Sequence, residues 1–216
     1  MRIRPELLTL YAVTDRSWLD GRQLADVVAE VLAGGATLVQ LREKDMDTES
    51  FIEEARDIKK ITDKYGVPLI INDNIEVCLA SGAAGVHVGQ SDMEAGHVRE
   101  LLGADRIIGV TAKTVAQAMR ATACGADYIG SGAVFGSTTK LDTKRMSLET
   151  LDDICNSVEI PVVAIGGIDE TNIEQLAGHR MAGAAVVSGL FAQADPYAAA
   201  MRLRALAEKV RDTNGH

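Results

Sequence analysis

A run of alternating polar residues near the start of the chain has the composition of an anion-binding site. From Val39 to Lys44 every second residue is polar, so a strand would place Gln40, Arg42 and Lys44 on one face. That face offers an amide and two cations. Because such side chains are costly to desolvate without a ligand or counter-ion, the pattern favours a ligand site, and a solvated strand face is the alternative.

Two later strand-like runs end in an aspartate. Asp73 follows Ile71-Asn72, and Asp92 follows the run from His87 to Ser91. Carboxylates at the ends of neighbouring parallel strands can face one cavity and suit Mg²⁺, which keeps several waters and is shared with substrate phosphates. Helix N-capping explains both aspartates equally simply, since each precedes a helical stretch. His87 is interpreted as a core or supporting histidine that packs with a single hydrogen bond.

Glycine and hydroxyl residues follow three strand-like runs in the second half of the chain. The first of these loops is Gly136-Ser137-Thr138-Thr139-Lys140, and the others are Gly166-Gly167 and Val187-Ser188-Gly189. Glycine allows backbone N–H groups to approach a phosphate closely, a use that is frequent in the last two loops of βα barrels. The alternative is that these glycines only allow the chain to turn. This alternative is weaker for the last two loops, because glycine recurs in both.

The scaffold that would position these residues is predicted by hydrophobic periodicity. Short β-branched runs alternate with amphipathic stretches that repeat at i, i+3, i+4 and i+7. An example of the latter runs from Leu24 to Leu32 and ends at Gly34-Gly35. The predicted strands are Leu8 to Thr14, Leu38 to Arg42, Leu69 to Asn72, Gly85 to Gly89, Ile107 to Thr111, Tyr128 to Phe135, Val162 to Ile165 and Ala184 to Ser188.

Local signals predict where the helices begin and end. Helix starts are expected at Asp47 or Thr48, at Thr114 and at Asp169, because these residues cap free backbone N–H groups. Gly-Ala pairs precede four strands and predict left-handed helix ends. They lie at Gly35-Ala36, Gly82-Ala83, Gly125-Ala126 and Gly183-Ala184.

Eight strands, each followed by a helix, predict the α/β class and a single TIM barrel, (β/α)8, that spans residues 1–216 as one domain. An open doubly wound sheet is the alternative. In a barrel, the polar residues at the strand ends gather at one mouth.

Charge, apolar runs and cysteine spacing bear on the partners and the compartment of the protein. The 216 residues carry a net charge of -9 without any basic run, which disfavours nucleic acid. The apolar stretch from Leu7 to Val13 is too short to span a membrane. Cys78, Cys124 and Cys155 lie far apart and outside metal-binding spacings, which indicates reduced thiols and predicts a cytoplasmic protein.

Taken in order along the chain, these motifs resemble the thiamine phosphate synthase family. The resemblance rests on the runs Gln40 to Lys44, Asn72-Asp73, His87 to Asp92, Ser137 to Lys140, Gly166-Gly167 and Val187-Ser188. It implies a transferase that condenses 4-amino-2-methyl-5-(diphosphooxymethyl)pyrimidine with 4-methyl-5-(2-phosphooxyethyl)thiazole, or with a carboxylated form of that thiazole. The implied products are thiamine phosphate and pyrophosphate, and one Mg²⁺ per subunit is implied. A homo-oligomer is compatible with the resemblance.

The resemblance also implies roles for individual residues. It assigns the pyrimidine diphosphate to Gln40, Arg42, Lys44, Asn72, Thr111 and Lys140, and the binding run includes Leu41 and Glu43. It assigns Mg²⁺ to Asp73 and Asp92. It assigns the thiazole phosphate to Ser137, Thr138, Thr139, Gly167, Val187 and Ser188. Catalysis is assigned to Arg42, Lys44, Lys140 and Thr111. The chain departs from the family at Thr111, where serine is common, and at Gly136-Ser137, where Pro-Thr is common.

Three other functions remain open from the sequence. A thiazole tautomerase-like isomerase would share the barrel but would not need the Gln40, Arg42 and Lys44 row. A phosphate-handling epimerase or isomerase would need an acid/base pair, for which the strand ends offer only His87. A non-catalytic binding barrel would keep the phosphate loops and lose the metal carboxylates. Fold alone does not decide among them.

Overall fold

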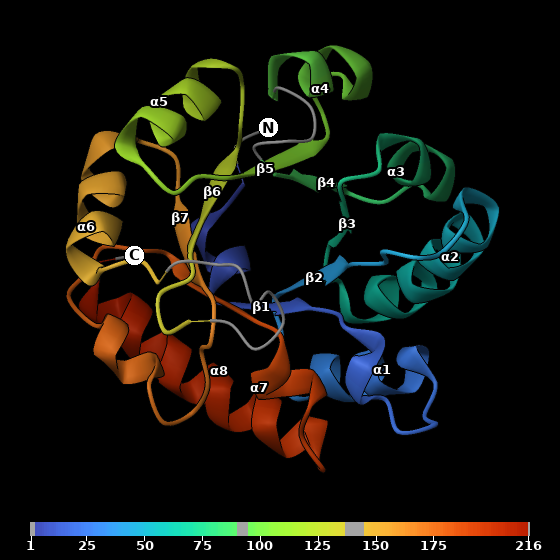
Figure 1. Cartoon of the computed structure of the whole chain (residues 1–216). Coiled ribbons are helices and arrows are strands. Elements are labelled where there is room, and N and C mark those ends of the chain that lie inside the picture. Colours follow the sequence, from blue (N-terminus) through green and yellow to red (C-terminus); the bar gives the residue numbers. More distant parts are fainter. Residues whose placement is uncertain (1–2, 90–94, 137–144, 216) are drawn as a thin grey trace.

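A closed barrel of eight parallel strands forms the centre of the molecule. The computed structural model describes residues 3–89, 95–136 and 145–215. Each strand pairs with its neighbours in sequence, and β8 returns to pair with β1, so that no edge is left open (Figure 1). The prediction of a TIM barrel is confirmed, and the open sheet is excluded.

The strands are short. They are β1 (Leu10–Val13), β2 (Leu38–Leu41), β3 (Leu69–Asn72), β4 (Gly85–Val88), β5 (Ile107–Thr111), β6 (Tyr128–Gly132), β7 (Val162–Ile165) and β8 (Gly183–Val186). The bounds of β3, β5 and β7 match the prediction, and the other five strands are shorter than predicted. Most of the residues that were predicted as strand but lie outside the observed strands belong to turns and loops. Leu8, for example, ends the 3-10 turn Pro5–Leu8 before β1.

Helices surround the strands in Figure 1. They are α1 (Leu24–Ala33), α2 (Thr48–Tyr65), α3 (Ile75–Ser81), α4 (Ala95–Leu102), α5 (Val115–Ala123), α6 (Leu148–Ser157), α7 (Ser188–Phe191) and α8 (Pro196–Thr213). The prediction of a helix after every strand is wrong at one place, because β7 leads into a 3-10 turn, Ile173–Leu176. Within the described ranges, no helix has the length and apolar character needed to span a membrane.

Two of the three predicted helix starts are confirmed. The Asp47 carboxylate accepts from the Ser50 N–H at 3.0 Å, and the Thr114 hydroxyl accepts from the Gln117 N–H at 3.2 Å. Asp169 was expected to cap a helix and does not, because its carboxylate closes a local turn by accepting from the Thr171 N–H.

The Gly-Ala prediction holds for three pairs and fails for the fourth. Gly35, Gly82 and Gly125 have φ of 107°, 73° and 92°, a left-handed conformation in which glycine has no steric penalty. Gly183 lies within β8 instead. A Cβ there would come 1.9 Å from the Leu8 carbonyl oxygen, so glycine is required for the close approach of two backbone segments.

Strand parity divides the core into two layers and directs the polar residues of the site. Val39 and Leu41 pack outward into the layer between strands and helices, with Phe51 among their neighbours in that layer. Leu38 belongs to the inner layer inside the barrel. Because side chains alternate along a strand, Gln40 also points toward the barrel axis.

Candidate functional site

A pocket lies inside the barrel mouth at the carboxyl ends of the strands. Residues from all eight strands, and from several of the loops that follow them, line this pocket. The structure brings together seven of the residues predicted from the sequence, namely Gln40, Arg42, Asn72, Thr111, Gly167, Val187 and Ser188. Their convergence depends on barrel closure, since they come from segments up to about 150 residues apart in the chain.

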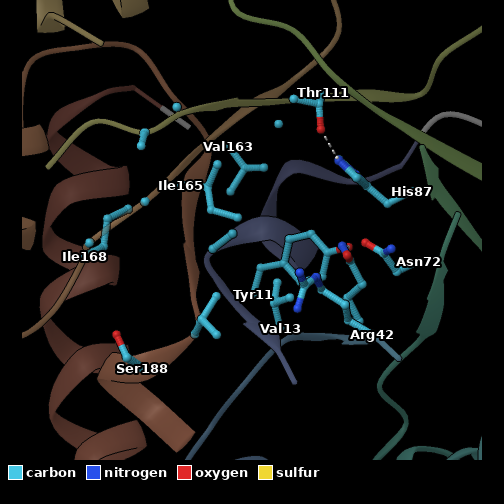
Figure 2. Close-up of a pocket in the computed structure, with 18 of the residues that line it drawn as sticks. Tyr11, Val13, Arg42, Asn72, His87, Thr111, Val163, Ile165, Ile168 and Ser188 are labelled. Atoms are coloured by element: carbon cyan, nitrogen blue, oxygen red, sulfur yellow. Dashed lines mark hydrogen bonds between the residues drawn. The ribbon is translucent and has the colours of Figure 1, made fainter. Parts of the chain in front are cut away.

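The two sides of this pocket differ in chemistry. Figure 2 shows Arg42 and Asn72 together on one side, with His87 and Thr111 beyond them. The opposite side is apolar and is formed by Val163, Ile165 and Ile168, with Ser188 at its edge (Figure 2). The pocket therefore offers a polar, cationic half and an apolar half that ends in a hydroxyl.

Arg42 is the most informative residue of the polar half. Its backbone N–H donates to the Thr14 hydroxyl at 2.9 Å, which fixes the residue directly after β2. Its guanidinium lies 3.5 Å from the Asp15 carboxylate and its side chain is only 12% exposed. Among the described residues, the buried Nη2 has no hydrogen-bond partner. A buried cationic N–H group in this state indicates that an anion completes the site.

A buried chain of hydrogen bonds runs behind the pocket. Gln40 Nε2 donates to the Tyr11 hydroxyl at 2.6 Å, and the hydroxyls of Tyr11 and Tyr128 lie 2.8 Å apart. His87 Nδ1 is 3.0 Å from the Tyr128 hydroxyl, and its Nε2 is 2.9 Å from the Thr111 hydroxyl. Burial raises the pKa of both tyrosines, which keeps the phenols neutral.

Sequence reasoning missed both tyrosines and interpreted His87 only as a supporting residue. His87 is half-buried, lines the pocket and has hydrogen-bond partners at both ring nitrogens. A signal for Tyr128 was present in β6. Tyr128, Gly130 and Gly132 occupy alternate positions of the strand. The two glycines that follow the tyrosine have no side chain, and both line the pocket.

Three residues of the predicted binding run lie away from this pocket. Leu41 packs in the outer core layer, while Glu43 and Lys44 line a neighbouring hollow that shares Arg42 with the pocket. The strand alternation that predicted one face for Gln40, Arg42 and Lys44 does not extend as far as Lys44. The reason is that β2 ends at Leu41, after which period-two alternation no longer applies.

One arginine bridges an acidic pair, Glu43 after β2 and Glu54 on α2. Arg16 Nε contacts the Glu43 carboxylate at 2.7 Å, and the same guanidinium contacts Glu54. Burial, to which the neighbouring Glu54 carboxylate adds, raises the pKa of Glu43 to about 7 although Arg16 opposes the shift. The folded state therefore holds a proton on Glu43 at pH values where the unfolded chain does not.

This pair predicts a pH-dependent stability. Because the folded pKa is raised, the contribution is fully present below the ordinary pKa of a glutamate and is lost as the pH rises through about 7. We expect the melting temperature to fall between about pH 5 and pH 8, and the fall to be smaller in Glu54→Gln. Thermal unfolding across this range measures it. Glu208→Gln, on α8, is the control and should keep the wild-type slope, whereas equal slopes in Glu54→Gln and wild type would contradict the assignment.

Of the two predicted metal ligands, the structure describes Asp73. It follows β3 with φ of 62°, a left-handed conformation that aspartate tolerates, and its carboxylate accepts from Asn72 Nδ2 at 2.6 Å. It is not a helix cap, because Asn74 caps α3 by accepting from the Val77 N–H. Asp92, Ser137, Thr138, Thr139 and Lys140 lie outside the described residues. In the part of the chain that is described, no three His, Cys, Asp or Glu side chains form a metal-binding group.

The donor chemistry at Asp73 nevertheless fits one class of ion. A single exposed carboxylate that follows the pocket residue Asn72 suits Mg²⁺, which is commonly held by one or two carboxylates, several waters and the oxygens of a substrate phosphate. Closed N/S-ligand sites of the zinc type need more protein ligands than this. Cys78, Cys124 and Cys155 form no disulfide, as predicted.

Comparisons with known proteins agree on one family. A family model described as "Thiamine monophosphate synthase" matches residues 10–190. The thiamine-phosphate synthase of Clostridium tetani is 50% identical over 187 residues, which cover 87% of this chain and 90% of that protein. A probable thiamine biosynthetic bifunctional enzyme of Oryza sativa is 48% identical, over 87% of this chain and 35% of that protein. The solved thiamine phosphate pyrophosphorylase from Pyrococcus furiosus is 34% identical with a TM-score of 0.88, covering 95% of this chain and 98% of its own.

Proposed function

This chain belongs to the thiamine monophosphate synthase family, and from that premise we propose that it joins a pyrimidine diphosphate to a thiazole phosphate with release of pyrophosphate. The observation that carries the proposal is Arg42, whose buried Nη2 has no partner among the described residues at the mouth of the barrel. A diphosphate supplies the anionic oxygens that this group requires.

The two halves of the pocket match the two substrates. In the polar half, Gln40, Asn72 and Thr111 surround a space suited to an aminopyrimidine whose diphosphate reaches Arg42. In the apolar half, Val163, Ile165 and Ile168 suit the thiazole ring. Its phosphate would be received by the Ser188 hydroxyl and by backbone N–H groups at Gly167 and Val187. Glu43 and Lys44 take part from the adjoining hollow, and Leu41, whose side chain packs in the outer core layer, takes part only through its backbone.

The reaction needs stabilisation of a leaving group more than proton transfer. The bond between the pyrimidine methylene carbon and the diphosphate oxygen breaks, and both electrons leave with pyrophosphate. The lone pair of the thiazole nitrogen then forms the new C–N bond to the methylene cation. No proton has to move at the reacting atoms, so no general base is required. Arg42 stabilises the negative charge that develops on the departing diphosphate.

Asp73 and Asp92 would hold Mg²⁺ in this proposal. The bound ion would supply Lewis-acid neutralisation of the diphosphate oxygens. The family resemblance assigns Ser137 to Lys140, in the sixth loop, to the phosphates, with Lys140 as a further cation. Three free thiols support the assignment of the enzyme to the cytoplasm, and its partners are proposed to be these small molecules.

The isomerase alternative is less well supported by the pocket. Within the described lining, no aspartate or glutamate faces the cavity to serve as a general base. His87 has both ring nitrogens engaged with neighbouring hydroxyls. The cationic Arg42 side would also have no role in moving a proton.

A direct assay tests the proposed function. Purified protein incubated with the pyrimidine diphosphate, the thiazole phosphate and Mg²⁺ should form thiamine phosphate and pyrophosphate in equal amounts, measured by chromatography and a phosphate-release assay. Without the thiazole phosphate, no thiamine phosphate should form. Absence of product with both substrates and metal present, from protein with native circular dichroism, would overturn the proposal.

A further inference from the structure

We infer that Tyr11 and Tyr128 are positioning residues that couple the tautomer of His87 to the orientation of the Gln40 amide, and so to the amide atom that faces the substrate. The inference rests on the proposed function and extends it to substrate selection. By holding the Gln40 Nε2 away from the cavity, the two phenols make the site accept a pyrimidine with a 4-amino group and reject one with a 4-oxo group.

The first step concerns the place of the two rings. Tyr11 and Tyr128 are 1% and 0% exposed, and they lie on β1 and β6, on different sides of the barrel interior. Their ring centroids are 5.9 Å apart with the planes at 73°, an edge-to-face contact. The His87 ring lies 5.4 Å from the Tyr128 ring. The hydroxyls are therefore held by packing, and buried phenolic protons require partners.

Two glycines make room for this arrangement. A Cβ at Gly109 would lie 2.1 Å from Tyr128 Cζ and 2.5 Å from His87 Nδ1. A Cβ at Gly130 would lie 2.9 Å from His87 Cε1. Since no side chain could occupy these positions without displacing the rings, β5 and β6 are built around the hydrogen-bonded chain.

The second step concerns the direction of the chain. An amide NH₂ group only donates, so the Tyr11 oxygen accepts from Gln40 and the Tyr11 proton is directed to Tyr128. The Tyr128 proton is then directed to His87 Nδ1, which must accept. A neutral histidine that accepts at Nδ1 carries its proton on Nε2, and that N–H donates to the Thr111 hydroxyl.

The third step is the consequence for the ligand. With Nε2 turned to Tyr11, Gln40 presents Oε1, an acceptor, to the pocket. An exocyclic amino group donates to this oxygen, whereas a 4-oxo group places oxygen against oxygen. To reverse the donors and acceptors of this hydrogen-bonded chain, the Gln40 amide would have to rotate and His87 would have to adopt its other tautomer. The two phenols therefore couple the His87 tautomer to the pyrimidine group, amino or oxo, that Gln40 recognises.

Removal of the hydroxyls tests the inference. The quantity measured is the inhibition constant of the 4-oxo pyrimidine diphosphate divided by the KM of the 4-amino substrate. In Tyr11→Phe the amide is free to rotate, and the ratio should fall about 10- to 100-fold, the range expected for one mismatched buried hydrogen bond. In Tyr128→Phe, Tyr11 still contacts Gln40 but no longer has a fixed proton direction, so a smaller fall is expected. Tyr197→Phe, exposed on α8, is the matched control and should leave the ratio unchanged.

Histidine nitrogen NMR supplies a readout independent of activity. Wild type should show His87 as the Nε2–H tautomer, and Tyr128→Phe should shift its population toward Nδ1–H. A Tyr11→Phe enzyme that loses activity but keeps the wild-type ratio, or an Nδ1–H tautomer in wild type, would overturn the inference. Wild-type protein that binds the 4-amino compound without forming product would instead count against the proposed function and leave the selectivity measurable by binding.

Discussion

Replacement of Arg42 by alanine is expected to lower kcat/KM by about 100- to 1,000-fold, the usual cost of losing one preorganised contact to a developing charge. The guanidinium is buried at the pocket wall, and its Nη2 has no partner in the described residues, so a substrate anion is the group most affected by its loss. The measurement is steady-state turnover of the pyrimidine diphosphate with saturating thiazole phosphate.

Two further variants separate charge from fold. Arg42→Lys keeps a cation but loses the planar pair of donors, and it should recover part of the activity. Arg202→Ala removes an exposed arginine paired with Glu170 on the outside of the barrel, and it should turn over substrate at the wild-type rate. Wild-type turnover in Arg42→Ala would remove this residue from the mechanism.

Removal of divalent metal is the second large effect expected. Chelation should lower turnover by at least about 100-fold, because a Lewis acid on a departing diphosphate supplies several kcal/mol of transition-state stabilisation. Added Mg²⁺ should restore the activity. Asp73→Asn should raise the Mg²⁺ concentration needed for half-maximal turnover, since the exposed carboxylate that follows the pocket residue Asn72 is then neutral.

The control for the metal prediction is an aspartate remote from the mouth. Asp63→Asn removes a carboxylate that pairs with Lys59 on the surface of α2, and its Mg²⁺ dependence should equal that of wild type. Turnover that survives exhaustive chelation would contradict the metal role. An unchanged Mg²⁺ requirement in Asp73→Asn would show that Asp73 is not a ligand.

Local patterns in the chain were sufficient for the architecture. The β-branched runs at Leu69–Asn72, Ile107–Thr111 and Val162–Ile165 became strands with the predicted bounds, because a strand buried on both faces needs a short apolar run. Parity also placed Gln40 toward the axis and Leu41 toward the helices. The capping residues Asp47 and Thr114 act within three residues of their partners, so their roles too are local.

The parts that failed depend on contacts between distant segments. The alternation that was predicted to reach Lys44 stops with β2 at Leu41, and beyond it Glu43 is held by Arg16 from the segment that follows β1. Gly183 serves a backbone contact with Leu8 that no neighbouring residue reveals.

Residue order along the chain was therefore enough to establish the strands, their inward and outward faces, and the family to which the motifs belong. Tertiary structure alone decided that Tyr11 and Tyr128, which are 117 positions apart, share a hydrogen bond, and that Arg42 is buried with an unfilled Nη2 in the described part of the chain. The physical reason is that hydrophobic periodicity is a property of each segment, whereas the partner of a buried polar atom depends on which segments barrel closure brings within about 3 Å of it.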